Sequence, residues 1–122
     1  MLFTGKELLL DAQKNNYAVG AFNVNNMEII QAIVGAAEET NSPVILQASQ
    51  GAIKYAGIEY IASLGKLAGL NSKVPVALHL DHGTDFDQVM LCIRHGFTSV
   101  MIDGSRFPLE ENIAYTKKVV EI

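Results

Sequence analysis

Four repeats of one pattern restrict the fold of this chain more than any other feature. In each repeat a short apolar run leads into a polar loop, and the loop leads into a stretch with apolar residues at helical spacing. The repeats lie about 27 residues apart, which is typical of a strand, a crossover helix and the next parallel strand. The apolar runs, which we predict to be strands, cover residues 17–22, 43–47, 74–80 and 99–102.

Helical stretches follow the strands and complete four units. They begin near Ile29, Ile58, Phe86 and Leu109. Thr4 with Glu7 predicts a capped opening helix before the first strand. We therefore predict an α/β fold with a single domain over residues 1–122, in which four consecutive β-α units form the first half of a (β/α)8 TIM barrel. A complete barrel needs about 250 residues, so we expect this barrel domain to be truncated.

The strands are apolar throughout, which predicts a parallel sheet covered on both faces. The polar residues gather after the predicted carboxyl ends of the strands, and parallel α/β folds build their sites at that edge. The opposite connections have the composition of plain helix-ending turns. We therefore expect the functional site at the edge of the sheet where the strands have their carboxyl ends.

The composition excludes several classes of function. The formal net charge is -4 and the nine Lys and Arg residues are scattered, so no basic patch is available for nucleic acid or an anionic membrane. No apolar run approaches membrane-spanning length, and no secretory signal is evident. Cys92 is the only cysteine, which excludes an internal disulfide and fits a reducing compartment. We expect a cytoplasmic domain without nucleic-acid or membrane partners.

The stretch LHLDHG at residues 78–83 is the strongest candidate for chemistry. His79, Asp81 and His82 lie at the carboxyl end of a buried strand, where each polar group needs a partner. In a structural interpretation His79 is a half-buried strand residue and Asp81 caps the next helix. In a functional interpretation, which we prefer, imidazole binds a metal and the carboxylate transfers a proton. Asp81 and His82 can address one substrate only if the strand bends or ends near Asp81, and Gly83 allows such a turn.

The remaining candidates are weaker. A catalytic zinc usually takes three protein ligands, and His95 is predicted to end a helix at the far end of the sheet. Lys54 is interpreted as a solvated lysine rather than a Schiff-base nucleophile. Gly51 and Gly57 are predicted to flank a loop that becomes ordered when ligand binds.

Several linked motifs give the chain a family likeness. VPVALHLDHG (74–83) resembles the first signature of class II, metal-dependent fructose-1,6-bisphosphate aldolases. AVGAFNVNN near the start, SPVILQASQGA in the second unit and GFTSVMIDGSRFPLEEN in the fourth resemble the same family in the same order. The resemblance covers essentially all 122 residues.

This resemblance implies a fold, a reaction and a set of site residues. His82 would be a ligand of the catalytic Zn²⁺, and Asp81 would transfer the proton of the hydroxyl whose deprotonation drives cleavage of the ketose bisphosphate. Asn23 and Ser49 match substrate-binding positions, Ser49 towards a phosphate. Asp103 matches a carboxylate that can hold a second divalent metal. The implied reaction belongs to glycolysis and gluconeogenesis, with phosphorylated ketose and triose substrates.

The family motifs that are absent define the alternatives. Two further zinc histidines, a catalytic glutamate and the main glycine-rich phosphate loop of the family are not present in this sequence. We expect the isolated chain to be inactive and to self-associate through open sheet edges, and the complete enzyme to be a homo-oligomer, a dimer or a tetramer. Tagatose bisphosphate is the alternative substrate. A noncatalytic module that binds phosphate or metal, either flavodoxin-like or a closed dimer of half-barrels, is the alternative class.

Overall fold

The computed structural model describes all residues 1–122 and contains four strands and six helices. The strands are β1 (Gly20–Asn23), β2 (Val44–Ser49), β3 (Val76–Gly83) and β4 (Ser99–Ile102). The helices are α1 (Gly5–Asn15), α2 (Met27–Glu39), α3 (Gln50–Ala56), α4 (Ile58–Asn71), α5 (Phe86–Arg94) and α6 (Leu109–Val120).

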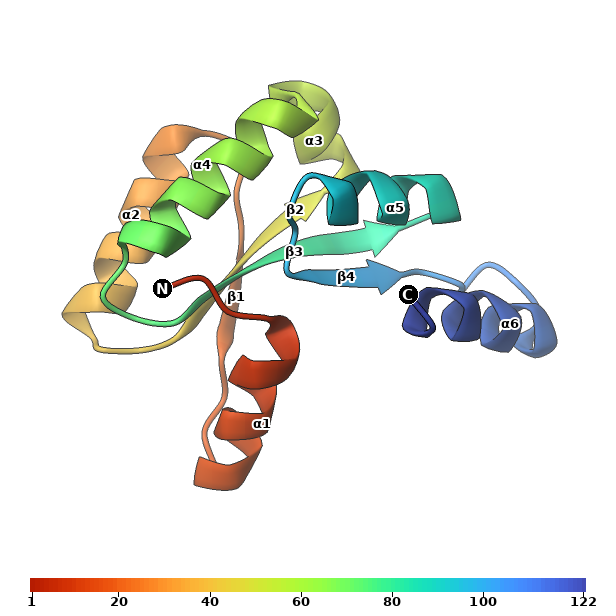
Figure 1. Ribbon diagram of the computed structural model, residues 1–122, viewed down its shortest axis with the longest axis horizontal. Helices are drawn as coiled ribbons and strands as arrows, with labels where there is room; N and C mark the ends of the chain where they lie inside the picture. The colour runs from red at the N-terminus through yellow and green to blue at the C-terminus, as the bar shows by residue number, and fades with distance from the viewer.

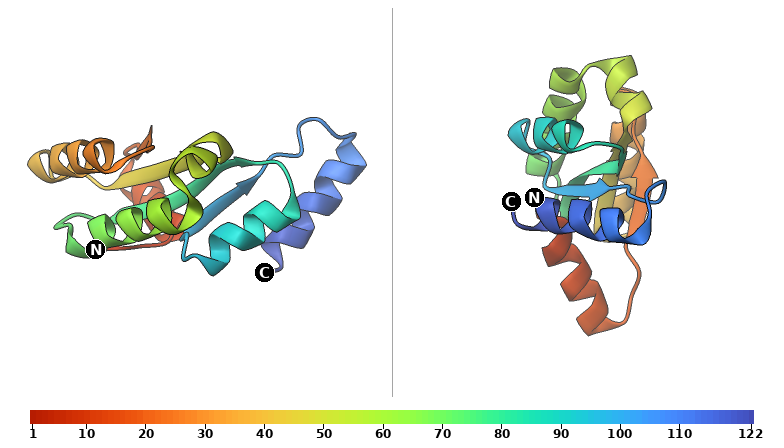
Figure 2. Two further views of the ribbon diagram at one scale, coloured as in Figure 1. Left: turned by 90° about the horizontal axis from the view of Figure 1, so that it is seen from above. Right: turned by 90° about the vertical axis from the view of Figure 1, so that its right-hand side faces the viewer.

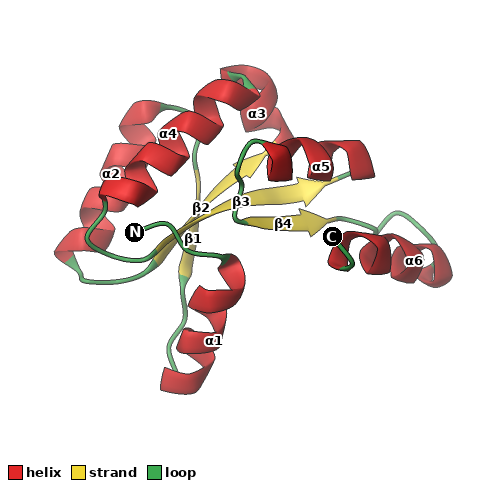
Figure 3. Cartoon of the chain, viewed as in Figure 1, coloured by secondary structure: helices red, strands yellow, loops and turns green.

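The order of the strands decides between the predicted folds. The sheet has the order β1-β2-β3-β4, and each neighbouring pair is parallel. Helices α2 to α6 form an arc along the sheet, while the strands fan out from β1 to β4 (Figures 1 and 3). A flavodoxin-like sheet has its first two strands interchanged, so that alternative is wrong. The predicted four consecutive β-α units of a half barrel are confirmed.

Only one face of the sheet carries the main core. In β2, Val44, Leu46 and Ala48 are fully buried, while the residues between them are only partly buried. The buried residues join the apolar sides of the helices in one hydrophobic cluster. The prediction that both faces would be covered is therefore wrong for this chain, because the alternate residues of β2 are only partly buried and all four residues of β1 are exposed.

The first strand is shorter than predicted. It begins at Gly20 rather than at Tyr17, because Tyr17 is held by the end of α1. The Tyr17 backbone N–H donates to Ala12 O at 3.1 Å, and the Tyr17 hydroxyl donates to Asp11 Oδ2 at 2.6 Å. This local pairing removes residue 17 from the sheet.

The segment predicted to be a loop between Gly51 and Gly57 forms helix α3 instead. The Ser49 hydroxyl accepts a hydrogen bond from Ala52 N at 3.1 Å and caps the helix. Ala52 and Ile53 are buried in the core, and Gly57 ends the helix with a positive φ of 88°. Lys54 lies exposed on α3, as expected of a solvated lysine.

Helix α1 lies at the amino end of the strands. The predicted capping box is present, with Thr4 Oγ1 accepting from Glu7 N at 3.2 Å. The preceding segment pairs with the start of β3, since Val76 N donates to Met1 O at 2.9 Å and Phe3 N donates to Val76 O at 2.8 Å. α1 projects from this end of the molecule (Figure 2). None of the six helices has the length and apolarity that crossing a membrane requires.

Candidate active site

The carboxyl end of β3 changes its backbone geometry at His82. Its register with β4 shifts between Leu80 and Gly83, and His82 has a φ of 52° in the left-handed region. A side chain in this region costs roughly 1–2 kcal/mol, so the surrounding contacts must hold it. The predicted bend is confirmed, although the positive φ falls on His82 rather than on Gly83.

Gly83 is required for close packing instead. A Cβ at this position would lie 2.8 Å from Leu80 Cδ2 and 2.9 Å from the carbonyl oxygen of Met101. The missing side chain therefore lets β3 approach β4 directly after the bend. β3 also runs on through residue 83, whereas the sequence predicted a strand that ended at Leu80.

A glutamine that the sequence did not single out connects two of the predicted residues. Gln47 Nε2 donates to Asn23 Oδ1 at 2.7 Å and lies 3.3 Å from Asp81 Oδ2. Asn23 ends β1, Gln47 lies in β2 and Asp81 lies in β3, so the contacts cross three neighbouring strands. The available signal was a polar residue two positions before Ser49, because alternate strand residues share a face.

The second group of contacts joins β3 to the loop after β4. His82 Nδ1 lies 2.7 Å from Asp103 Oδ2, and the second oxygen of Asp103 accepts from Ser105 N at 3.0 Å. The Asp103 backbone N–H donates to Gly83 O at 2.7 Å. His82 Nε2 lies 3.6 Å from Asp81 Oδ1. Asn23, Gln47, Asp81, His82 and Asp103 thus form one polar row, which we call the site row.

Ser49 and His79 lie beside the site row. Ser49 is in register with Asp81, yet its hydroxyl is engaged in capping α3. His79 Nδ1 lies 2.7 Å from Ser99 Oγ, and burial lowers the pKa of His79. His79 therefore fits the structural interpretation, as a partly buried histidine with one hydrogen-bond partner. His95 caps the end of α5, where its Nδ1 lies 2.8 Å from Leu91 O, as predicted.

The donor atoms of this chain do not make a complete metal site. No group of three or more His, Cys, Asp or Glu side chains is arranged to hold a metal ion. The site row contains a single imidazole, and Nδ1 of that imidazole already contacts Asp103. A catalytic zinc usually takes three protein ligands, so the single imidazole of the site row does not by itself make such a site.

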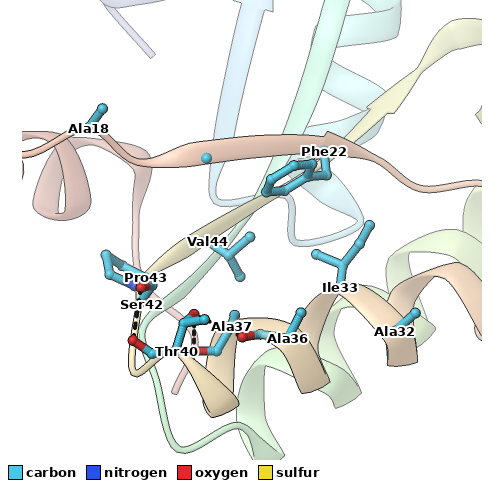
Figure 4. A pocket seen from close by; sticks show the side chains of 11 residues that line it. Ala18, Phe22, Ala32, Ile33, Ala36, Ala37, Thr40, Ser42, Pro43 and Val44 are labelled. Carbon is cyan, nitrogen blue, oxygen red and sulfur yellow. Dashed lines mark hydrogen bonds between the residues drawn. The ribbon is translucent and has the colours of Figure 1, made fainter.

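An apolar groove lies apart from the site row. It has a volume of about 480 Å³ and is bounded by β1, α2 and the start of β2. Phe22, Ile33 and Val44 give it an apolar lining (Figure 4). It contains no carboxylate or imidazole, so it offers no groups for acid-base chemistry.

Comparison with known proteins agrees with the geometry. The sequence model of the family described as "Fructose-bisphosphate aldolase class-II" matches residues 3–122. The chain belongs to the class II fructose-bisphosphate aldolase family. The predicted family resemblance is thereby confirmed, and this family is generally metal-dependent.

Two curated relatives show the extent of the similarity. The fructose-bisphosphate aldolase of Staphylococcus aureus (strain Mu50) is 52% identical over 123 residues, which is 98% of this chain and 43% of the relative. The fructose-bisphosphate aldolase of Thermus caldophilus is 53% identical over 121 residues, which is 99% of this chain and 39% of the relative. The chain thus spans less than half the length of these two relatives.

Solved aldolase structures share the fold. The YdjI aldolase from Escherichia coli K12 matches with a TM-score of 0.92 and 35% identity, over 99% of this chain and 46% of that chain. The fructose-bisphosphate aldolase from Campylobacter jejuni matches with a TM-score of 0.82 and 33% identity, over 98% and 41% of the two chains.

The His82–Asp103 pair predicts a pH-dependent contact. The hydrogen bond to Asp103 raises the pKa of His82 above its ordinary 6.5, and the hydrogen bonds from Ser105 and His82 hold the pKa of Asp103 well below its ordinary 3.8. The stabilisation from His82 is fully present below pH 6.5 and is lost as the pH rises through its folded pKa. The stabilisation from Asp103 is present above pH 3.8 and is lost as the pH falls through its folded pKa.

An NMR titration of His82 in the metal-free protein measures this contact. We expect Asp103→Asn to lower the pKa of His82, because it removes the carboxylate that favours the imidazolium. Asp87→Asn is the matched control, since Asp87 is an exposed acid in the first turn of α5. An unchanged His82 titration in Asp103→Asn would contradict the contact.

Proposed function

We propose that this chain is the N-terminal part of an enzyme that cleaves a ketose bisphosphate by a reversible aldol reaction. The substrate is fructose 1,6-bisphosphate, and the products are dihydroxyacetone phosphate and glyceraldehyde 3-phosphate. The supporting observation is the site row, which places two carboxylates and an imidazole at the carboxyl ends of β3 and β4. Sites in barrel folds are built at this end.

Asp81 is proposed to be the proton-transfer residue. Its side chain is about one-fifth exposed, and Gln47 contacts only one of its oxygens. The other oxygen is available to take the proton of the C4 hydroxyl. The C3–C4 bond then breaks, the C4 aldehyde leaves as glyceraldehyde 3-phosphate, and the electron pair stays on the three-carbon fragment. Protonation of that fragment at C3 by water gives dihydroxyacetone phosphate, and Asp81 returns its proton to the solvent.

The other predicted residues are proposed to bind metal and substrate. His82 would be one ligand of a Zn²⁺ ion in the full-length enzyme, and Asp103 would hold a second divalent metal. Zinc supplies polarisation of the ketose carbonyl when it is bound. Asn23 binds the substrate, with its carboxamide oriented by Gln47. Ser49 contacts a phosphate, which requires its hydroxyl to donate while it accepts from Ala52.

The full-length enzyme is proposed to be a cytoplasmic homo-oligomer that acts on phosphorylated sugars. The single cysteine, Cys92, is buried and unpaired, which is consistent with a reducing compartment. The curated relatives are named for fructose bisphosphate, and this name favours fructose over tagatose as the sugar.

A cleavage assay on the full-length protein tests this function. Triose phosphate release is measured from fructose 1,6-bisphosphate and from tagatose 1,6-bisphosphate, before and after treatment with a chelator and after adding Zn²⁺ back. We expect faster cleavage of the fructose substrate, loss of activity with chelator and recovery with zinc. Activity that resists the chelator but is lost with borohydride would indicate a Schiff-base lysine and overturn the proposal.

A further inference from the structure

Three side chains outside the site row meet at the same edge of the sheet. Gln50 lies at the start of α3, Thr84 follows β3, and Arg106 lies in the loop between β4 and α6. Gln50 Nε2 donates to Thr84 Oγ1 at 2.9 Å, and Arg106 Nη2 donates to the Thr84 carbonyl oxygen at 2.9 Å. We call these three residues the Thr84 clamp.

Each side of the clamp is itself held in place. The Arg106 guanidinium lies 4.7 Å from the centre of the Phe107 ring, and that ring stacks on Tyr115 of α6 at 5.1 Å. Stacking orients the planar guanidinium towards Thr84. The Arg106 side chain therefore loses less conformational entropy when it forms the hydrogen bond. On the other side, Gln50 directly follows Ser49, the residue that caps α3. The clamp thus links the start of α3 with the loops after β3 and β4.

The clamp holds Thr84, which lies two residues after the strained residue His82. His82 has a φ of 52°, and such a conformation persists only when surrounding contacts determine it. The Asp103 backbone N–H donates to Gly83 O, directly before Thr84. Asp103 thus bonds to Gly83, and Gln50 and Arg106 bond to Thr84. These contacts leave the backbone of His82 little freedom to relax.

We propose that Gln50 and Arg106 are positioning residues, which hold Thr84 and thereby keep His82 in its left-handed conformation beside Asp81 and Asp103. They act on the backbone of β3 and not on the reacting atoms. The consequence for catalysis rests on the proposed aldolase function, whereas the consequence for the backbone does not.

Arg106→Ala in the full-length protein is the decisive variant. The Arg106 side chain is exposed, so its loss leaves the buried core unchanged. We expect amide hydrogen exchange at Asp103 to rise about tenfold, because this amide is bonded to Gly83 O beside the released Thr84. The amide of Thr98, bonded to Leu78 O at the other end of β3, serves as the internal reference and should keep its exchange rate.

Kinetics of the same variant give a second readout. We expect kcat to fall about tenfold with little change in KM, because misplaced groups lose transition-state contacts more than ground-state binding. Arg106→Lys keeps a hydrogen-bond donor but loses the planar group that stacks on Phe107. Its kcat should therefore lie between those of Arg106→Ala and the wild type. Arg94→Ala, at the exposed end of α5, is the matched control and should match the wild type in both readouts.

The possible results separate the hypotheses. Faster exchange at Asp103 with Thr98 unchanged supports the clamp, even if the protein cleaves no sugar phosphate and the proposed function fails. Unchanged exchange at Asp103 overturns the clamp, and a rise in KM alone would then identify Arg106 as a contact of the substrate phosphate. An equal rise at Asp103 and Thr98 overturns it as well, because it shows general loss of stability.

Discussion

Asp81→Asn in the full-length enzyme is expected to lower kcat for fructose 1,6-bisphosphate cleavage by roughly 10²–10⁴-fold. The amide cannot take the proton of the substrate hydroxyl, although it has nearly the shape of the carboxylate. The Gln47 contact also changes, since Gln47 Nε2 now faces either an amide oxygen or an amide nitrogen. The measurement is steady-state release of triose phosphate at saturating substrate.

Two controls show whether a loss of activity in Asp81→Asn is specific: the variant should keep its fold, and the same substitution at another aspartate should have no effect. Asp81 is partly exposed, so the substitution does not bury an unpaired group. Asp87→Asn removes an exposed acid six positions further along and should leave kcat unchanged. Near-normal turnover in Asp81→Asn would show that another group moves the proton, and Asp81 would then lose its proposed role.

His82→Ala is expected to reduce the zinc affinity of the full-length enzyme by at least about 100-fold, with a parallel loss of activity. The expectation follows from the position of the imidazole, which is 61% exposed and has Nε2 directed to the Asp81 side of the site row. The alanine also removes the partner of Asp103. Zinc content after dialysis against a metal buffer, measured by elemental analysis, gives the result.

His95→Ala controls for the loss of a histidine as such. His95 lies at the end of α5, and its ring contacts a backbone carbonyl rather than any carboxylate. This variant should keep its full zinc content and turnover. Normal zinc binding by His82→Ala would instead show that His82 is not a ligand, and the Asp103 contact would become its main role.

Residues of the site row were predictable from the sequence where a polar residue type coincided with the end of a predicted strand. Asp81, His82 and Asp103 follow apolar runs, so their type and place predicted one functional edge. Gln47 was not predicted, since a single glutamine in an apolar strand gives no signal by itself. Its role depends on the register that sets it between Asn23 and Asp81.

The short helix α3 shows why a loop was predicted wrongly. It has seven residues, and isolated helices of this length do not form in water because nucleation is costly. Its glycine content also favours a loop. Burial of Ala52 and Ile53 against the core and capping by Ser49 stabilise it in the folded chain. Tertiary packing thus overrides weak local preference.

The sequence alone determined the features that depend on near neighbours along the chain. Apolar periodicity predicted β4 at its observed bounds and the start of α5, and the capping box of Thr4 and Glu7 predicted the start of α1. The tertiary structure alone decided between the half-barrel and the flavodoxin-like strand orders, and it alone revealed the left-handed turn at His82 and the contact of His82 with Asp103 across 21 positions. Caps and helical periods act within a few residues, whereas the site row forms only when strands from different units pair in one register.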